Sequence, residues 1–137
     1  MHEVEWKKVF SGILSEKPNE REETYEWVRD KFWQDEVIER LKVELEKGDK
    51  RRTEKVYIIN AIAAVGVEKA TVILAKKRSE FHQKIKQNEM DAPENVELIY
   101  LISCVDTALR SIITKIKTKG DLSLKNLVQK NFAILKK

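Results

Sequence analysis

Arg78 and His82 are the residues of this sequence that come nearest to a reactive pair. They lie four positions apart in a predicted helix, with Glu80 between them. A histidine titrates near neutral pH, so His82 has the right chemistry for a general acid or base. Arg78, however, falls inside the apolar stripe of its own helix, where a charge needs a partner. We expect Asp106, at the edge of a later apolar helix face, to pair with Arg78 in a structural role.

Catalysis and metal binding lack the further side chains that they need. Helical nuclease domains of the HEPN type separate their arginine and histidine by four to six residues, whereas three residues separate Arg78 from His82. Cys104 is the only cysteine and is expected to be a small core residue. Neither a metal-ligand spacing nor a phosphate-binding glycine loop is present. We therefore predict no enzyme activity, no metal and no cofactor, with a ribonuclease using Arg78 and His82 as the alternative.

Charge is distributed unevenly along the chain. The first 48 residues carry 9 Lys and Arg against 13 Asp and Glu, whereas residues 49–137 carry 18 against 10. Lys and Arg bind nucleic acids by neutralising phosphates, so the second half is a candidate polyanion-binding surface. The residues predicted to form it are Lys69, Lys76, Lys77, Lys84, Lys115, Lys117, Lys119 and Lys125. The alternative is a solvated face whose positive field is balanced by the acidic first half.

Aromatic residues are concentrated in the first part of the chain. Six of the ten lie within the first 33 positions. Tyr25, Val28 and Phe32 form an apolar stripe at helical spacing, and Trp27 lies off this stripe. Tryptophan is enriched at the energetic centres of protein interfaces, so Trp27 and Trp33 are predicted to contact a protein partner or a second copy of the chain. The alternative is that some of these rings pack beneath the first helix.

Residues 60–72 resemble the helix-turn-helix of bacterial repressors. A glycine, Gly66, stands at the turn, and the positions that such motifs bury are filled by Ala61, Val65, Val67, Val72 and Ala75. The resemblance implies a DNA-binding regulator whose second helix enters the major groove. Ile73 and Leu74, however, stand where that helix should be exposed and polar. A buried helical hairpin bent at Gly66 is therefore the favoured interpretation.

The same segment, followed through the basic turn Lys76, Lys77 and Arg78, also resembles the central helices of another protein class. These are the small all-helical subunits of RNA-guided CRISPR effector complexes. The shared features are small apolar residues around Gly66 and the basic turn after them. The resemblance implies a basic, non-catalytic protein that lines nucleic acid.

Apolar residues recur every three to four positions along nearly the whole chain, which predicts an all-α fold. We expect a compact bundle of about five to six helices with a buried central helical hairpin around Gly66. The predicted helices cover residues 3–14, 19–47 with a kink at 33–35, 53–65, 67–89, 94–118 and a last helix from 123. The fifth has the clearest apolar face, formed by Leu98, Leu101, Ile102, Val105, Leu109, Ile112, Ile113 and Ile116.

Several residues are typical of helix ends. Asn19 with Glu22 resembles a capping box, and Thr53 is placed to cap the third helix. Gly48 suits the position just after a helix C-terminus, where glycine adopts positive φ.

Length and composition indicate the number of domains, the location and the origin of the protein. The 137 residues suit one domain, so residues 1–137 are predicted to form a single all-helical domain. A single cysteine excludes an internal disulfide, and no apolar stretch reaches membrane-spanning length or resembles a signal peptide. The expected location is the cytoplasm. The abundance of Lys and Glu is typical of hyperthermophile proteins, which favours a thermophilic origin.

These features predict a non-catalytic helical binding module. Its basic second half would contact nucleic acid or an acidic partner, and its aromatic first half would contact protein. A helix-turn-helix regulator and a small subunit of an RNA-guided CRISPR effector complex are the alternatives.

Overall fold

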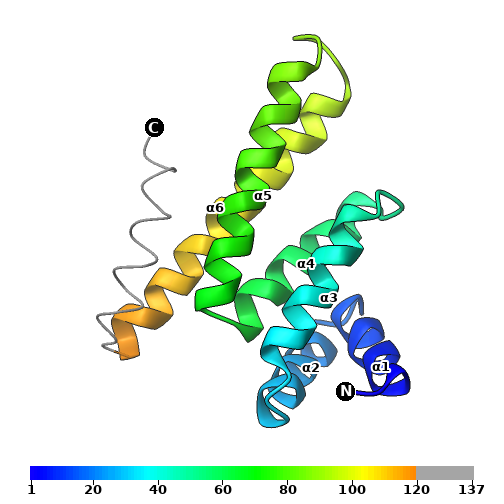
Figure 1. Ribbon diagram of the computed structural model, residues 1–137, viewed down its shortest axis with the longest axis vertical. Coiled ribbons are helices and arrows are strands. Elements are labelled where there is room, and N and C mark those ends of the chain that lie inside the picture. The colour runs from blue at the N-terminus through cyan, green and yellow to red at the C-terminus, as the bar shows by residue number, and fades with distance from the viewer. Residues whose placement is uncertain (120–137) are drawn as a thin grey trace. The chain divides into compact units, whose positions relative to one another are not determined.

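The computed structural model describes residues 1–119, and all regular secondary structure in that range is helical (Figure 1). This confirms the predicted all-α fold. The helix predicted from residue 123 lies outside the described residues. The six helices are α1 (Glu3–Ile13), α2 (Pro18–Asp30), α3 (Gln34–Glu46), α4 (Arg52–Val65), α5 (Glu68–Gln87) and α6 (Glu94–Lys119).

The chain divides into two compact units. Unit 1 is Met1–Gly66 and contains α1 to α4, whereas unit 2 begins at Val67 and contains α5 and α6. Because the boundary falls between α4 and α5, the single domain and the packed hairpin around Gly66 stay predictions. None of the described helices is both long enough and apolar enough to cross a membrane.

Unit 1 is built around α4, which packs against α1, α2 and α3. Contact with three neighbours explains why α4 is apolar on all sides. Ile58, Ile59, Ala61 and Ile62 of this helix are fully buried. The other helices contribute their buried stripes to the same core, among them Trp6, Val9, Ile13, Tyr25, Val28, Val37, Ile38, Leu41 and Leu45.

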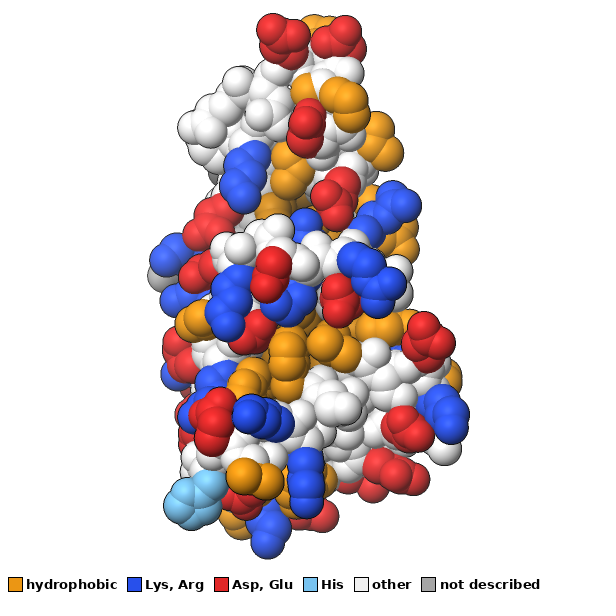
Figure 2. All heavy atoms as spheres, turned by 90° about the vertical axis from the view of Figure 1, so that its right-hand side faces the viewer, with side chains coloured by type: hydrophobic (Ala, Val, Ile, Leu, Met, Phe, Trp, Pro, Cys, Tyr) orange, Lys and Arg blue, Asp and Glu red, His pale blue; other side chains and the backbone are white. Residues whose placement is uncertain are grey.

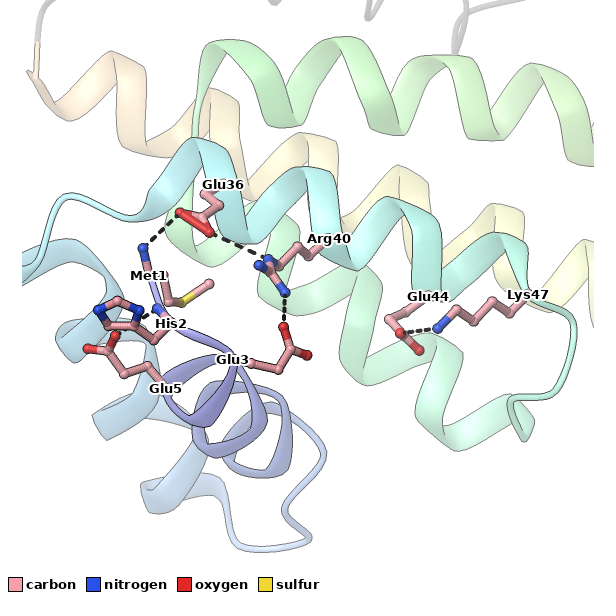
Figure 3. A network of polar contacts seen from close by, with 8 residues as sticks. All are labelled: Met1, His2, Glu3, Glu5, Glu36, Arg40, Glu44 and Lys47. Carbon is pink, nitrogen blue, oxygen red and sulfur yellow. Dashed lines mark hydrogen bonds and ion pairs between the residues drawn. The ribbon is translucent and has the colours of Figure 1, made fainter.

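A small polar network joins the start of α1 to α3 within unit 1 (Figure 3). The Met1 amine lies 3.4 Å from a carboxylate oxygen of Glu36. Arg40 reaches both Glu36, at 3.5 Å, and Glu3 of α1, at 3.2 Å. These pairs are partly exposed and contribute little free energy each, so they orient the two helices more than they stabilise them.

The ends of two helices differ from the predicted ones. α2 begins at Pro18, with Lys17 at the N-cap. Proline suits the first helical position because its fixed φ is helical and it lacks the N–H that would be left unpaired. Asn19 is therefore inside the first turn, and its prediction as a cap is wrong. Likewise α4 begins at Arg52, one residue before the predicted cap Thr53, and Glu54 accepts a hydrogen bond from the Arg51 N–H at 2.9 Å.

Gly48 is confirmed as the residue after a helix C-terminus. It follows the C-cap Lys47 of α3 and has a φ of 74°. Helices commonly end on such a left-handed residue, and glycine adopts this conformation without a steric penalty.

The long helix predicted over residues 19–47 is two helices, so the prediction of a kink is wrong. The break is made by Phe32, which has a φ of 57°. The N–H of Trp33 donates to the carbonyl of Val28 at 3.0 Å, and that of Phe32 donates to Arg29 at 3.1 Å. This is a Schellman ending with a phenylalanine at the position that usually carries glycine.

In unit 2, α5 and α6 run antiparallel around the loop 88–93 (Figure 1). The predicted apolar face of α6 is confirmed, with Leu98 and Ile113 half-buried and six residues buried: Leu101, Ile102, Val105, Leu109, Ile112 and Ile116. The loop is held by Asn95, whose amide donates to the carbonyl of Glu89 at 3.0 Å and accepts from Asn88 at 3.1 Å.

Candidate binding surfaces

Arg78 of α5 and Asp106 of α6 form the pair expected from the sequence. The Arg78 Nε donates to the Asp106 Oδ1 at 2.7 Å. Only 12% of the Arg78 side chain and 21% of the Asp106 side chain are exposed. A hydrogen-bonded ion pair satisfies charges that would otherwise be costly to bury. This pair therefore fixes how α5 and α6 align, and it removes Arg78 from the surface cations.

His82 lies one turn after Arg78 and is half-buried. Burial lowers the pKa of the His82 imidazole, and the positive charge of Arg78 lowers it further against the opposing effect of Asp106. These effects favour the neutral form of the imidazole. Its acidic neighbour Asp106 accepts the hydrogen bond from Arg78 through Oδ1, and the ribonuclease alternative stays a prediction.

Cys104 is half-buried on α6. Burial raises the pKa of its thiol, and a hydrogen bond with Tyr100 opposes that shift. A protonated thiol is a poor nucleophile and a poor metal ligand. Within residues 1–119, no three His, Cys, Asp or Glu side chains gather at a position that could hold a metal ion.

The half of the α5–α6 hairpin that lies away from its loop is strongly basic. We call residues 68–78 and 106–119 the basic segment. Its two acids, Glu68 and Asp106, and its eight basic residues give it a formal net charge of +6. The basic residues are Lys69, Lys76, Lys77, Arg78, Arg110, Lys115, Lys117 and Lys119. The hydrogen bonds Arg78–Asp106 and Asn88–Asn95 set the alignment of the helices, so both parts of the segment lie at the same end of the hairpin.

The loop half of the hairpin has the opposite character. Residues 79–105 hold five acids against two lysines, Lys84 and Lys86, and four of the acids surround the loop: Glu89, Asp91, Glu94 and Glu97. Acidic and hydrophobic side chains lie next to one another at the top of Figure 2, where this loop is located. The α5–α6 hairpin therefore has one acidic end and one basic end.

The predicted cationic residues differ in their access to a ligand. Lys76, Lys84 and Lys117 are exposed, whereas Lys69 and Lys115 are half-buried. Lys84 lies on the loop half of α5, outside the basic segment. Lys119 is the last residue of α6, and Lys125 lies outside the described residues. Arg110 is an exposed cation that the prediction omitted, although its place opposite the apolar stripe of α6 could have identified it.

Lys77 does not belong to the exposed surface. It is only 6% exposed, and its Nζ lies 2.9 Å from a carboxylate oxygen of Glu80. The helical repeat places it on the same face as Leu74 and Phe81, which are both buried. Its assignment to a nucleic-acid surface is therefore corrected. Its position on the buried face of the helix, and not its residue type, decides that it is buried.

The first turns of α5 do not present a polar face of the kind that reads DNA bases. Ile73 and Leu74, which a helix-turn-helix would expose, are buried, and Val72, which it would bury, is 49% exposed. Thr71 is fully buried, and its hydroxyl donates to the carbonyl of Val67 at 2.7 Å. Apolar side chains contact little on a base edge beyond a thymine methyl, so this arrangement disfavours the helix-turn-helix alternative.

An aromatic cluster surrounds the turn between α2 and α3. We call Trp27, Phe32 and Trp33 the aromatic turn. The two tryptophan rings meet edge to face with centroids 5.3 Å apart, and both side chains are half-buried. Phe32 is 87% exposed, so its prediction as a core residue beside Tyr25 and Val28 is wrong. The reason is that α2 ends at Asp30, and the helical repeat does not extend to Phe32.

A groove of about 730 Å³ runs between α1 and α2 and reaches the aromatic turn at Trp27. Its wall contains apolar, acidic and basic side chains: Val4, Lys7, Lys8, Ser11, Gly12, Glu20, Glu23, Thr24 and Trp27. Of these residue types tryptophan is enriched at protein interfaces, whereas Lys, Glu and Ser are depleted there, so Trp27 is the feature of this wall that suits a protein partner.

Replacement of Phe32 by glycine is expected to stabilise unit 1 by about 1 kcal/mol. A side chain in the left-handed region costs about this much, and the exposed ring recovers little of it through burial. Chemical unfolding followed by tryptophan fluorescence measures the change. Phe32→Ala is the control, because it removes the ring but keeps the strained Cβ, and it should leave stability close to wild type. A less stable Phe32→Gly protein would show that the ring packs within the chain.

Comparisons of this chain with protein-family models, with curated protein sequences and with solved structures find no match.

Proposed function

We propose that this protein is a non-catalytic helical binding module whose basic segment binds nucleic acid and whose aromatic turn contacts a protein. The observation that carries the first part is the separation of charge along the α5–α6 hairpin. The basic segment has a formal net charge of +6, while four of the seven acids in residues 67–119 lie around the loop at the other end. A field of one sign over a continuous surface attracts a polyanion more strongly than scattered, alternating charges do.

The expected mode of binding is contact with phosphates. Lysine ammonium groups act as point charges on phosphate oxygens, and each neutralised phosphate releases condensed counterions. The exposed positions of α5 before Arg78 are Glu68, Val72 and Lys76, which together offer few hydrogen-bonding groups to base edges. We therefore propose binding that tolerates different sequences, as phosphate contacts alone carry no sequence information.

The aromatic turn has surroundings that suit a protein partner. Residues 20–39, which include it, hold eight acids against three basic residues. This negative charge repels nucleic acid, while Trp27, Phe32 and Trp33 offer the ring surface that anchors many protein interfaces. The proposed partner of this surface is a protein whose own surface is basic around an apolar pocket.

Reversing three charges of the basic segment tests the nucleic-acid proposal. The variant Lys69→Glu/Lys76→Glu/Lys117→Glu should bind mixed-sequence RNA and duplex DNA much more weakly than wild type. The slope of log K against log salt should fall by about 2 to 3, since each lost phosphate contact removes about 0.9 for duplex DNA. Fluorescence anisotropy over a series of salt concentrations gives both quantities.

The matched control reverses three exposed cations of unit 1, in the variant Lys7→Glu/Lys8→Glu/Lys31→Glu. Both variants change the net charge of the chain equally, so a difference between them reports the position of the charges. Equal loss in the two variants, or no binding by wild type at low salt, would contradict the proposal.

A further inference from the structure

The outer face of α6 near the loop is apolar, although it is opposite the buried stripe of the same helix. Val96, Ile99 and Tyr100 are 66%, 60% and 47% exposed. Ile99 follows Val96 by three residues, and the exposed Ser103 follows Tyr100 by three residues. These intervals place all four side chains on one side of the helix. We call Val96, Ile99, Tyr100 and Ser103 the outer α6 face. Solvent-exposed large apolar side chains gathered on one face mark an interaction surface.

Charge changes sign from the loop before α6 to the far end of this helix. Before the outer α6 face lies the acidic loop with Glu89 and Asp91, and no Lys or Arg occurs from residue 87 to 109. After it, Arg110 and Lys117 are exposed on the same side, because they follow Ser103 at intervals of seven residues. In chain order, an acidic loop is therefore followed by the apolar outer α6 face and then by the basic end of the helix.

From this order we infer that two copies of the chain pair through the outer α6 face, with their α6 helices antiparallel. A two-fold axis near Ile99 and Tyr100 makes the interface self-complementary, since each copy offers the same patch to the other. Along the paired helices, residue n of one copy then lies at the same height as residue 199 − n of the second copy. The outer α6 faces of the two copies therefore cover each other. Ser103, which is small, lies opposite Val96 of the second copy and permits the helices to approach closely.

Charge complementarity favours a second copy in this orientation. In the antiparallel pair, Arg110 lies beyond the level of Glu94, the first residue of α6 in the second copy, and therefore on the side of its acidic loop. A parallel pair would place acid beside acid and base beside base, at a cost in free energy. Lys117 lies about 26 Å along the helix from the axis, given a rise of about 1.5 Å per residue. The ends of the two basic segments therefore extend beyond the interface, and the inference does not depend on the proposed nucleic-acid binding.

The oligomeric state of the full chain tests this inference. One helix face per copy makes a small interface, so we expect a dimer with a dissociation constant in the micromolar range. Sedimentation equilibrium of wild type should show dimer increasing with protein concentration. Ile99→Glu should be monomeric over the same range, because it buries a charge at the axis. The matched control Val72→Glu introduces the same charge at an exposed apolar position of α5 and should dimerise as wild type does.

Engineered cysteines test the orientation separately. Both are made in a Cys104→Ser background, so that each variant has one thiol. Ile99→Cys lies at the axis and should form a disulfide-linked dimer under mild oxidation. Thr114→Cys is exposed further along α6, and two copies of it would be about 44 Å apart in the antiparallel pair, too far for a disulfide.

The outcomes separate clearly. Crosslinking at residue 99 but not at 114, with dimer lost in Ile99→Glu alone, supports the antiparallel pair. A wild-type protein that stays monomeric, a dimer that survives Ile99→Glu, or crosslinking at residue 114 would overturn it. Circular dichroism of each variant checks that the helices are intact.

Discussion

Replacement of Gly12 by alanine is expected to reduce the free energy of unfolding of unit 1 by about 2 kcal/mol. Gly12 lies in the middle of the contact between α1 and α2. A Cβ added there would lie 2.0 Å from the Thr24 Oγ1 and 3.0 Å from the Thr24 Cβ. The Thr24 side chain is buried, and its hydroxyl donates to the carbonyl of Glu20 at 2.8 Å. Neither atom can move away without losing this bond or separating the two helices.

The sign of the Gly12→Ala effect is informative because two contributions oppose each other. Within a helix, alanine is more favourable than glycine by about 1 kcal/mol. Overpacking of a tight contact costs roughly 1–3 kcal/mol, and occasionally more. With a contact as short as that at Thr24, we expect overpacking to exceed the helix preference. A Gly12→Ala protein more stable than wild type would show that α1 and α2 separate easily.

Tryptophan fluorescence is the right measurement, since Trp6, Trp27 and Trp33 all belong to unit 1 and no tryptophan occurs after them. Ser11→Ala is the control for helix preference at the neighbouring exposed position, and it should change stability little. Removing Thr24 Oγ1 and Cγ2 in Gly12→Ala/Thr24→Ala should recover part of the loss. An equal loss in the double variant would mean that Thr24 is not the source of the strain.

Helix positions and buried stripes could be predicted from the sequence because burial imposes a repeat. The apolar residues of α6 from Leu101 to Ile116 recur every three to four positions, and the structure buries them against α5. The pairing of Arg78 with Asp106 followed from the same reasoning, since a charge inside an apolar stripe needs an acid at the edge of the facing one. Sequence periodicity therefore specified both a packing face and one contact across it.

Helix ends were harder to predict because they depend on a few hydrogen bonds that leave little mark on composition. Phe32 shows this well. A phenylalanine at helical spacing from Val28 is typical of a core stripe, and nothing in its residue type indicates positive φ. The Schellman bonds to Val28 and Arg29 decide the conformation instead. Asn19 and Thr53 were equally suitable as caps, yet α2 and α4 begin one residue earlier, at Pro18 and Arg52.

The candidate surfaces could be predicted only as regions. Net charge by segment indicated a basic second half, and the basic segment of α5 and α6 lies within it. Which lysines are exposed depends on the face of the helix, and this separates Lys76 from its buried neighbour Lys77. The outer α6 face was not predicted at all, since Val96, Ile99 and Tyr100 are interleaved with the core positions of the same helix. An exposed apolar residue cannot be told from a buried one by type.

Removing one partner of the Arg78–Asp106 pair is expected to reduce the free energy of unfolding of unit 2 by about 2 kcal/mol. In Asp106→Leu, the Arg78 guanidinium stays largely buried without its carboxylate, and in Arg78→Met the same holds for Asp106. Loss of one member of a fully buried pair costs roughly 3–5 kcal/mol, and partial exposure of this pair reduces the figure. The control is Arg40→Met, which removes the more exposed pairs with Glu3 and Glu36 and should cost less than about 1 kcal/mol.

The double variant Arg78→Met/Asp106→Leu should be within about 1 kcal/mol of wild type, because two apolar side chains leave no charge to desolvate. Losses that simply add in the double variant would show that the two side chains act independently. Urea unfolding should be followed by far-ultraviolet circular dichroism and by tryptophan fluorescence, since unit 2 contains no tryptophan. In a single cooperative domain, both signals shift together in Asp106→Leu. A shift in the dichroism alone would mean that the unit beginning at Val67 unfolds independently of Met1–Gly66.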